Sequence, residues 1–219
     1  AITGEPTNLH IGVQAKGVLA CRILVHGRAA HGSTPWLGDN AVLKALDVFR
    51  TIEAMPFARE SSEMFDRPSI NLGRIQGGDA INRVPDHCTA YVDIRYLPGQ
   101  DPSAILGAVR EIPDCEVEPV FHREPAIVDR EHPLVGLLAR AVREDATPEL
   151  ISVGRDGASD AISFLAAGIP AVEFGPVGGG HHGPEEWVSI SSLERYSGAL
   201  VRFVESIANE PRAKRLRVA

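Results

Sequence analysis

Cysteine is scarce in this sequence. Its 219 residues include only three cysteines, Cys21, Cys88 and Cys115, which are odd in number, far apart and without a CxxC pair. A disulfide-stabilised secreted scaffold has an even set of cysteines at close spacing, so the sequence argues against that class. We therefore expect a protein of a reducing cytoplasm.

Excess positive charge and long apolar runs are also missing. The formal net charge is −7, which argues against a general nucleic-acid or anionic-membrane surface. No stretch approaches the roughly 18 apolar residues of a membrane span, and no signal peptide is visible. The only basic cluster lies in residues 211–219, which we interpret as a solvated terminus. We expect neither nucleic acid nor a membrane as a partner.

The hydrophobic pattern divides residues 17–121 into six elements. Stretches of period two or rich in β-branched residues predict strands, and apolar residues three or four apart predict helices. The expected strands are residues 17–29, 69–78, 86–97 and 115–121, and the expected helices are residues 41–55 and 101–112. The order β-α-β-β-α-β is the signature of a ferredoxin-like two-layer sandwich, which we expect as a domain over residues 17–121.

Both helices of this sandwich carry start signals. Asp39 or Asn40 can cap the first helix, and Asp101 can cap the second, with Pro102 at its first position. The apolar residues that we expect to cluster on one face of the first helix are Val42, Leu43, Leu46, Val48 and Phe49. This face is expected to pack on the sheet.

The remainder of the chain alternates helices with strands. We expect helices at residues 132–146, 158–168 and 190–210, and strands at residues 149–154 and 170–176. Ser191 or Ser192 lies near the start of the last helix. The alternation predicts a mostly parallel sheet covered by helices. Residues 1–16 are too short to form a domain, so we assign them, with residues 122–219, to one α/β domain that carries the sandwich as an insertion.

Polar residues lie in loops at the expected ends of strands, where an α/β sheet commonly forms its site. In "TGEPTN", Pro6 pushes Glu5 toward an extended conformation. A rigidly held carboxylate suits a metal ion, and a surface turn is the other interpretation. In "GRDGASDA", Gly157 allows close backbone approach and Ser159 opens a helix. That helix start can bind an anion such as a substrate carboxylate, or Ser159 can be an ordinary cap.

The stretch "GGGHHGPEEW" places two adjacent histidines behind three glycines. Histidine is the commonest metal ligand, but a histidine pair in a glycine-rich loop is also compatible with a solvated turn. His182 lies four residues before Glu186, and the glycines would let its imidazole turn toward Glu5. Both interpretations stay open on this stretch alone.

Six motifs, in order along the chain, resemble one enzyme family. They are "GEPTN", "KG", "GRAAHGSTPWLGDNAV", "GGDAINRVPDHCTAYVDIRYLP", "GASDA" and "HHGPEEWV". Over essentially the whole chain they resemble the M20 family of metallopeptidases and amidohydrolases, which includes acetylornithine deacetylase, succinyl-diaminopimelate desuccinylase, carboxypeptidase G2 and aminoacylases. The resemblance implies an α/β catalytic domain (residues 1–16 and 122–219) with an inserted ferredoxin-like lid (residues 17–121) through which the protein forms a homodimer.

For the metal centre, the resemblance implies two Zn²⁺ ions in each active site of the intact enzyme, with Co²⁺ or Mn²⁺ as alternatives. Glu5 matches a ligand of one ion, and His182 matches a ligand of the second. His181 fits less well, because the family's histidine sits four residues before the glutamate that is Glu186 here.

For the substrate, the resemblance implies contacts from the lid and from one loop. His31 matches the lid histidine that reaches the partner subunit's active site and stabilises the developing oxyanion. Asn82 and Arg95 match lid residues that contact the substrate carbonyl or carboxylate, and a planar guanidinium suits a carboxylate. Ser159, preceded by Gly157, stands in the family's substrate-binding loop. We also expect an edge strand near "GVLACRILV" to pair across a two-fold axis.

The implied activity is the hydrolysis of a peptide or N-acyl amide bond in a small amino-acid-derived substrate with a free carboxylate, through metal-activated water. The family's first metal-binding His, its bridging Asp and its Glu-Glu pair lie upstream of "GEPT" and have no counterpart here. We therefore expect a C-terminal portion that binds zinc weakly and is inactive alone. The alternative is a non-catalytic dimerisation or amino-acid-binding module on a ferredoxin-like sandwich.

Overall fold

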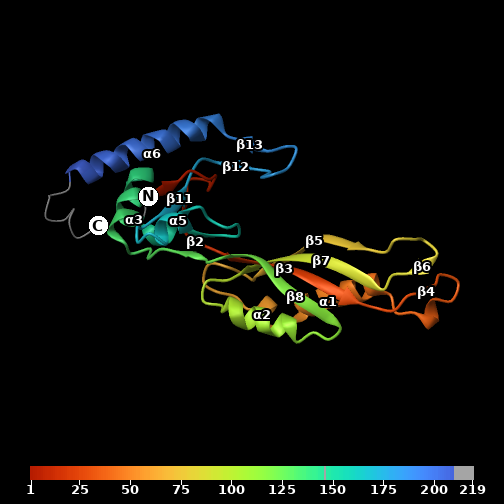
Figure 1. The fold of residues 1–219 in the computed structure, drawn as a ribbon. Helices are drawn as coiled ribbons and strands as arrows, with labels where there is room; N and C mark the ends of the chain where they lie inside the picture. The colour runs from red at the N-terminus through yellow and green to blue at the C-terminus, as the bar shows by residue number, and fades with distance from the viewer. Residues whose placement is uncertain (146, 210–219) are drawn as a thin grey trace. The chain divides into compact units, whose positions relative to one another are not determined.

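The computed structural model describes residues 1–145 and 147–209, so the basic cluster interpreted as a solvated terminus lies outside the described residues. The chain divides into two compact units, which we describe separately (Figure 1). Unit 1 combines residues 1–15 with those from residue 126 on, and unit 2 comprises residues 16–125. The expected boundaries, 16/17 and 121/122, differ from this division by one residue and four residues.

Unit 2 contains a four-stranded antiparallel sheet in the order β5-β7-β3-β8. The strands of this sheet are β3 (Gly17–His26), β5 (Ser69–Gly77), β7 (His87–Tyr96) and β8 (Cys115–Arg123). The helices of the unit are α1 (Ala41–Ala54) and α2 (Pro102–Arg110), with short 3-10 helices at Pro35–Leu37 and Pro56–Arg59. A separate two-stranded ribbon pairs β4 (Ala30–His31) with β6 (Arg83–Val84). The central strands are the first and third of the β-α-β-β-α-β order, as in the expected ferredoxin-like sandwich, which is confirmed. β8 ends at residue 123, beyond the expected end at residue 121.

The position of β3 overturns one expectation. Its residues pair with β7 on one side and with β8 on the other, so β3 has no free edge. The prediction that the "GVLACRILV" strand pairs across a two-fold axis is therefore wrong. The free edges of this sheet are β5 and β8.

Helix α1 packs on the sheet through small residues. Asn40 is its cap, and its side-chain oxygen accepts the Val42 N–H at 2.9 Å. The expected face is wrong in part, because Leu43 is 59% exposed. The buried residues are Ala41, Ala45, Val48 and Ile52. They recur every three or four residues, and the two alanines let the helix approach the strands closely.

Unit 1 contains a mixed sheet in the order β1-β11-β2-β10, with β9 also paired to β2. Its strands are β1 (Ile2–Thr3), β2 (Ile11–Ala15), β9 (Ala126–Ile127), β10 (Ser152–Arg155) and β11 (Val172–Phe174), and a hairpin pairs β12 (Gly178–Gly179) with β13 (Trp187–Val188). The β1–β11 and β10–β2 pairs are parallel, whereas β2 is antiparallel to β11 and β9. The α/β class is confirmed, but this sheet is not mostly parallel.

A tight loop explains the reversed direction of β2. The loop of residues 4–10 contains a turn in which the His10 N–H donates to the Thr7 carbonyl at 3.0 Å. Asn8 and Leu9 hold left-handed backbone conformations with φ of 57° and 62°. A parallel return needs a crossover of a dozen or more residues, so this short loop can only turn the chain back.

The helices of unit 1 are α3 (Pro133–Val142), α4 (Pro148–Ile151), α5 (Ala161–Leu165) and α6 (Ile190–Asn209). Three of them follow the expected order with changed limits. α4 was not expected, and it takes the first three residues of the strand expected at residues 149–154, so that β10 begins at residue 152. α5 is shorter than the expected residues 158–168. Ser191 and Ser192 lie in the first turn of α6, as expected, and the Ser189 hydroxyl in front of the helix accepts the Ser192 N–H at 3.4 Å. No helix in the described part of the chain has the length and apolar character needed to cross a membrane.

The start of β3 depends on a glycine. A Cβ atom on Gly17 would lie 2.2 Å from the ring of Tyr96, which is fully buried. Tyr96 is fixed in that place because its hydroxyl bonds His122 Nε2 at 2.9 Å and donates to the Arg123 carbonyl at 3.2 Å. The ring therefore cannot move aside without breaking these bonds.

We expect Gly17→Ala to lower the free energy of unfolding of unit 2 by about 1–3 kcal/mol, because a methyl group is forced into a filled space. Gly107→Ala is the matched control, since nothing lies within 4 Å of a Cβ atom at that position in α2. It should stabilise the helix by about 0.5–1 kcal/mol. Urea denaturation compares the two, and equal stabilities would contradict the close packing described above.

Candidate functional site

The loop that carries Glu5 is tied to the end of β11. Thr7 is buried, and its hydroxyl donates to the His10 carbonyl at 2.5 Å and accepts the Gly175 N–H at 3.0 Å. The Leu9 N–H donates to the Gly175 carbonyl at 3.0 Å. The backbone around Glu5 is therefore fixed, while the Glu5 side chain is exposed.

The hairpin that carries His182 begins beside the same loop. β1 and β11 are parallel neighbours, so the segments that follow them leave the sheet at one edge. A Cβ atom on Gly175 would lie 2.1 Å from the Glu5 carbonyl oxygen, which requires glycine at this contact. The Gly178 N–H donates to Asn8 Oδ1 at 3.3 Å. The structure thus brings together the bases of the two loops in which the metal ligands are expected.

The tip of the hairpin holds both histidines. Gly180 and His182 have left-handed backbones with φ of 72° and 61°, and the Gly183 N–H donates to the Gly180 carbonyl at 2.8 Å. His181 Nδ1 lies 3.7 Å from Glu186 Oε1. Glu186 is thus partnered with His181 rather than with the histidine expected as a metal ligand, His182.

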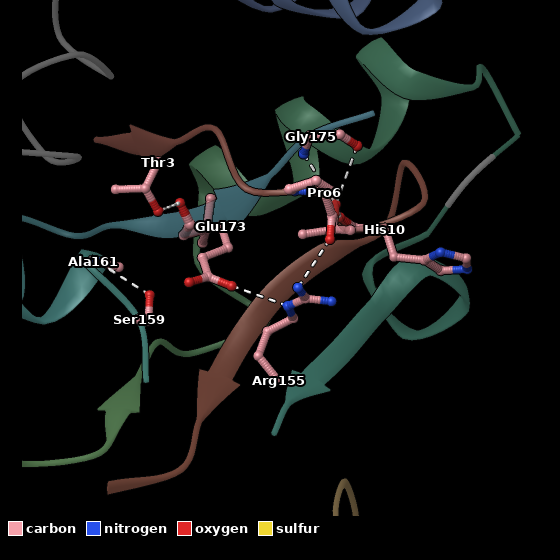
Figure 2. A network of polar contacts seen from close by, with 10 residues as sticks. Thr3, Pro6, His10, Arg155, Ser159, Ala161, Glu173 and Gly175 are labelled. Atoms are coloured by element: carbon pink, nitrogen blue, oxygen red, sulfur yellow. Dashed lines mark hydrogen bonds and ion pairs between the residues drawn. The ribbon is translucent and has the colours of Figure 1, made fainter. Parts of the chain in front are cut away.

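A partly buried charged network lies next to these loops. Arg155 of β10 donates from Nε to Glu173 Oε2 at 3.0 Å and from Nη2 to the Pro6 carbonyl at 2.9 Å (Figure 2). Sequence reasoning missed these residues. The signal was a glutamate in the apolar stretch "PAVEFG", because a buried carboxylate requires a charged partner.

The loop of Gly157 and Ser159 is exposed at Gly157, but its Ser159 side chain is turned inward. Ser159 is 4% exposed, and its hydroxyl oxygen accepts the Ala161 N–H at 3.1 Å (Figure 2). A Cβ atom on Gly157 would meet nothing within 4 Å, so no close approach in the described structure demands a glycine there. This geometry favours the helix-cap interpretation of Ser159 over a direct substrate contact.

The described residues contain no group of three or more His, Cys, Asp or Glu side chains arranged to hold a metal ion. Glu5 and His182 are chemically suited to zinc, but each can offer one donor group. A structural or catalytic zinc site needs at least three protein ligands. The residues described here therefore do not make a complete zinc site by themselves.

Unit 2 brings His31 and Asn82 together. In the β4–β6 ribbon His31 pairs with Arg83, and the next residue, Gly32, donates its N–H to the Asn82 carbonyl at 2.7 Å. A Cβ atom on Gly32 would lie 3.1 Å from the Asn82 Cα, so the close approach of the two segments favours glycine. Arg83 secures the ribbon through ion pairs with Asp79 at 2.7 Å and Asp86 at 2.9 Å.

The hydrogen bonds of the His31 ring indicate which of its two nitrogens carries the proton. The Ser33 backbone N–H donates to Nδ1 at 3.1 Å, and Ser33 Oγ lies 2.7 Å from the same atom. Because Nδ1 accepts from a backbone N–H, the neutral ring carries its proton on Nε2. The exposed Nε2–H can then donate to an oxygen of a bound molecule.

Arg95 lies apart from this pair. It stands near the far end of β7, opposite Val18 and Ser69, eight residues after His87. At about 3.3 Å per residue this is a separation of roughly 26 Å along the strand. Its guanidinium forms an ion pair with Asp93, two residues earlier on the same face, at 2.9 Å. Arg95 is thus held within unit 2 but is not joined to His31 and Asn82.

The cysteines do not provide an alternative nucleophile. Cys21 and Cys88 are buried in the core of unit 2, and all three thiols are free. Burial raises the pKa of the Cys21 thiol to about 11, with Arg110 opposing the rise, and burial also raises the pKa of Cys88. A buried thiol of raised pKa remains protonated and unreactive at neutral pH.

Comparisons with known proteins agree with this architecture. The family model described as "Peptidase dimerisation domain" matches residues 13–118. Acetylornithine deacetylase of Myxococcus xanthus is 34% identical over 224 residues, covering 93% of this chain and 56% of that protein. A protein of Aspergillus fumigatus named "Probable carboxypeptidase" is 35% identical over 120 residues, covering 51% of this chain and 27% of that protein.

Solved structures show the same fold. An aminopeptidase PepT from Bacillus cereus has a TM-score of 0.73 at 23% identity, covering 94% of this chain and 56% of that chain. A tripeptidase from Staphylococcus aureus has a TM-score of 0.73 at 21% identity with the same coverage, 94% and 56%. The present chain therefore spans just over half the length of these proteins.

We expect Thr7→Val to lower the free energy of unfolding by about 1–3 kcal/mol, because it leaves the His10 carbonyl and the Gly175 N–H without their buried partner. Thr7→Ser is the matched control, since it keeps the hydroxyl and removes only a methyl group, and it should cost less. Denaturant unfolding measures both. A Val variant as stable as the Ser variant would show that the hydroxyl does not hold the loop.

Proposed function

We propose that this chain, which belongs to the M20 family of metallopeptidases and amidohydrolases, is part of an enzyme that hydrolyses an amide bond. The substrate is a small amino-acid-derived molecule with a peptide or N-acyl bond and a free carboxylate. The observation that carries the proposal is the contact between the bases of the Glu5 loop and the His182 hairpin at one sheet edge. The free cysteines fit a cytoplasmic location.

The proposed centre holds divalent metal ions, with zinc first and cobalt or manganese as alternatives. Glu5 and His182 would each donate one ligand, and the remaining ligands would come from polypeptide outside this chain. A bound zinc ion would polarise the amide carbonyl and lower the pKa of water. The tied backbone of the Glu5 loop supports this role, because a metal ligand must be held in a fixed direction.

The lid residues would act on the substrate. The Nε2–H of His31 would donate to the oxyanion that develops as the amide is attacked, and the neighbouring Asn82 amide would contact the carbonyl. As in the family, His31 would serve the active site of the partner subunit. Arg95, oriented by its ion pair with Asp93, would bind the free carboxylate. The loop of Gly157 and Ser159 would line the substrate pocket through its backbone.

The partner that we propose is a second copy of the protein, which meets this one along β5. Both edge strands have one register irregularity, but β8 also carries Pro119 and the ion-paired Glu116 and Glu118. Proline and charged side chains protect an edge from pairing. β5 has no proline, its one charged residue, Arg74, lies over the Tyr91 ring of β7, and it exposes the apolar side chain of Ile75.

Unit 1 supports the presence of further polypeptide in the active enzyme. It holds a cavity of about 410 Å³ lined mainly by apolar side chains, among them Leu138, Leu200 and Phe203. α6 also exposes apolar residues along its length, namely Ile190, Leu193, Val201 and Val204. Contiguous apolar surface of this kind is usually covered in the working protein. We assign its cover to the part of the longer protein that this chain does not include.

The alternative is a non-catalytic dimerisation or amino-acid-binding module. The absence of a three-ligand metal group among the described residues favours it. The two proposals differ in whether the full-length protein requires a metal ion to hydrolyse an amide.

We expect the full-length protein to hydrolyse N-acylated amino acids and to lose this activity when a chelator removes its metal. His31→Ala should lower kcat by about 10²–10³, because it removes an oxyanion donor. His26→Ala is the matched control, since the His26 ring bonds the exposed Glu116 at 3.0 Å and has no role in the proposed site. A panel of N-acetyl and N-succinyl amino acids and dipeptides, assayed by amine release, gives the measurement.

The chain of residues 1–219 serves as the negative control in that assay. It should bind zinc weakly and release no amine. Metal-dependent turnover by this chain alone would contradict the incomplete centre, and inactivity of the full-length protein with every metal would favour the non-catalytic module.

We expect Ile75→Lys to weaken dimerisation and to shift sedimentation toward the monomer, because it places a charge on the β5 edge itself, where Ile75 is 37% exposed. Val120→Lys, a matched change on the β8 edge at 50% exposure, should leave the dimer intact. Dissociation by Val120→Lys but not by Ile75→Lys would assign the interface to β8.

A further inference from the structure

Arg155 connects three segments of unit 1 that are distant in sequence. Its guanidinium donates to Glu173 of β11 and to the carbonyl of Pro6, the residue that follows Glu5 (Figure 2). Only 5% of the Glu173 side chain is exposed. We infer that Arg155 is a positioning residue that fixes the backbone from which the Glu5 side chain extends. The inference rests on the proposed role of Glu5 as a metal ligand.

Stability alone is a poor account of this ion pair. Glu173 lies between Val172 and Phe174, which are both buried. A well-packed apolar pair in such a place is commonly as stable as a buried ion pair, or more so. What an apolar pair cannot supply is a donor to the Pro6 carbonyl. A lysine would carry the charge but lacks the planar fork that reaches two acceptors in fixed directions.

The sheet is shaped to let Arg155 reach these partners. β2 lies between β10, which carries Arg155, and β11, which carries Glu173. The arginine side chain passes over Gly12 of β2, where a Cβ atom would lie 2.9 Å from Arg155 Cγ and 3.1 Å from Glu173 Cβ. A side chain at position 12 would displace the arginine stem. Gly12 therefore contributes to the same arrangement, because it leaves room for the arginine side chain to cross β2.

The Glu5–Pro6 segment is held from a second direction as well. The buried Thr7 hydroxyl bonds the Gly175 N–H, and the Gly175 backbone packs on the Glu5 carbonyl. Pro6 fixes its own φ. With the backbone held on both sides, the direction in which the Glu5 side chain leaves the loop is fixed before a metal ion arrives, and only its rotamers remain free.

Hydrogen exchange in the chain of residues 1–219 tests whether Arg155 holds the loop of residues 4–10 in place. In Arg155→Lys, we expect the amides of Asn8 and Leu9, which donate to carbonyls after β11, to exchange at least tenfold faster. The amides of Leu138 and Ala139 in α3 should keep their rates. Arg22→Lys, which alters an exposed ion pair in unit 2, should change neither set. An equal rise throughout unit 1, or no change at Asn8 and Leu9, overturns the inference.

A second variant guards against loss of the fold. Arg155→Met combined with Glu173→Leu replaces the ion pair by apolar side chains, and it should keep the unfolding midpoint while still speeding exchange at Asn8 and Leu9. Slow exchange in this folded variant would overturn the inference, because the tie to Pro6 is gone.

Zinc affinity of the full-length protein tests the consequence for the metal. Competition with a chromophoric chelator should show affinity lowered 10–100-fold in Arg155→Lys, as for other residues that orient a ligand, with kcat at saturating zinc nearly unchanged. Unchanged affinity would overturn the positioning role. Absence of zinc binding by the unaltered protein would refute the proposed function, and with it the ligand role of Glu5, while the exchange result still decides whether Arg155 holds the loop.

Discussion

The parallel pairing of β1 with β11 is the contact on which unit 1 depends. Ile2 pairs with Val172 and Thr3 with Glu173, so a two-residue strand at the start of the chain is held by a segment 170 positions later. The loops that follow these strands then meet without either being long. A short strand has little stability of its own, and here it is fixed by the hydrogen bonds and packing of Thr7 and Gly175 beyond its end.

Much of this architecture could be predicted from the sequence. In unit 2 the order of strands and helices was recoverable because alternation along β7 and the caps at Asn40 and Asp101 are local signals. The central position of β3 follows from the same order, because a ferredoxin-like sheet has its first and third strands in the middle, and the expectation of an edge strand near "GVLACRILV" conflicted with it. The buried face of α1 was misjudged because large apolar side chains were given more weight than Ala41 and Ala45.

The residues of the candidate site were also predictable only in part. Glu5, His182, His31 and Asn82 were proposed from motifs. The structure brings the Glu5 loop to the base of the His182 hairpin, and it brings His31 to Asn82 at the β4–β6 ribbon. Arg155 was missed because its importance lies in a long-range contact with Glu173. Ser159 illustrates the reverse case, since a residue in a recognisable motif has its hydroxyl occupied by a backbone N–H.

Unit 2 is inserted into unit 1 between two strands that pair with each other. Ala15, the last residue of β2, pairs with Ala126, the first of β9, in antiparallel register. The whole of unit 2 therefore occupies the place of a hairpin turn, which two residues can fill in other proteins. A sheet with this connection can accept inserted domains of different size between those alanines without any change to the strands next to the Glu5 loop and the His182 hairpin.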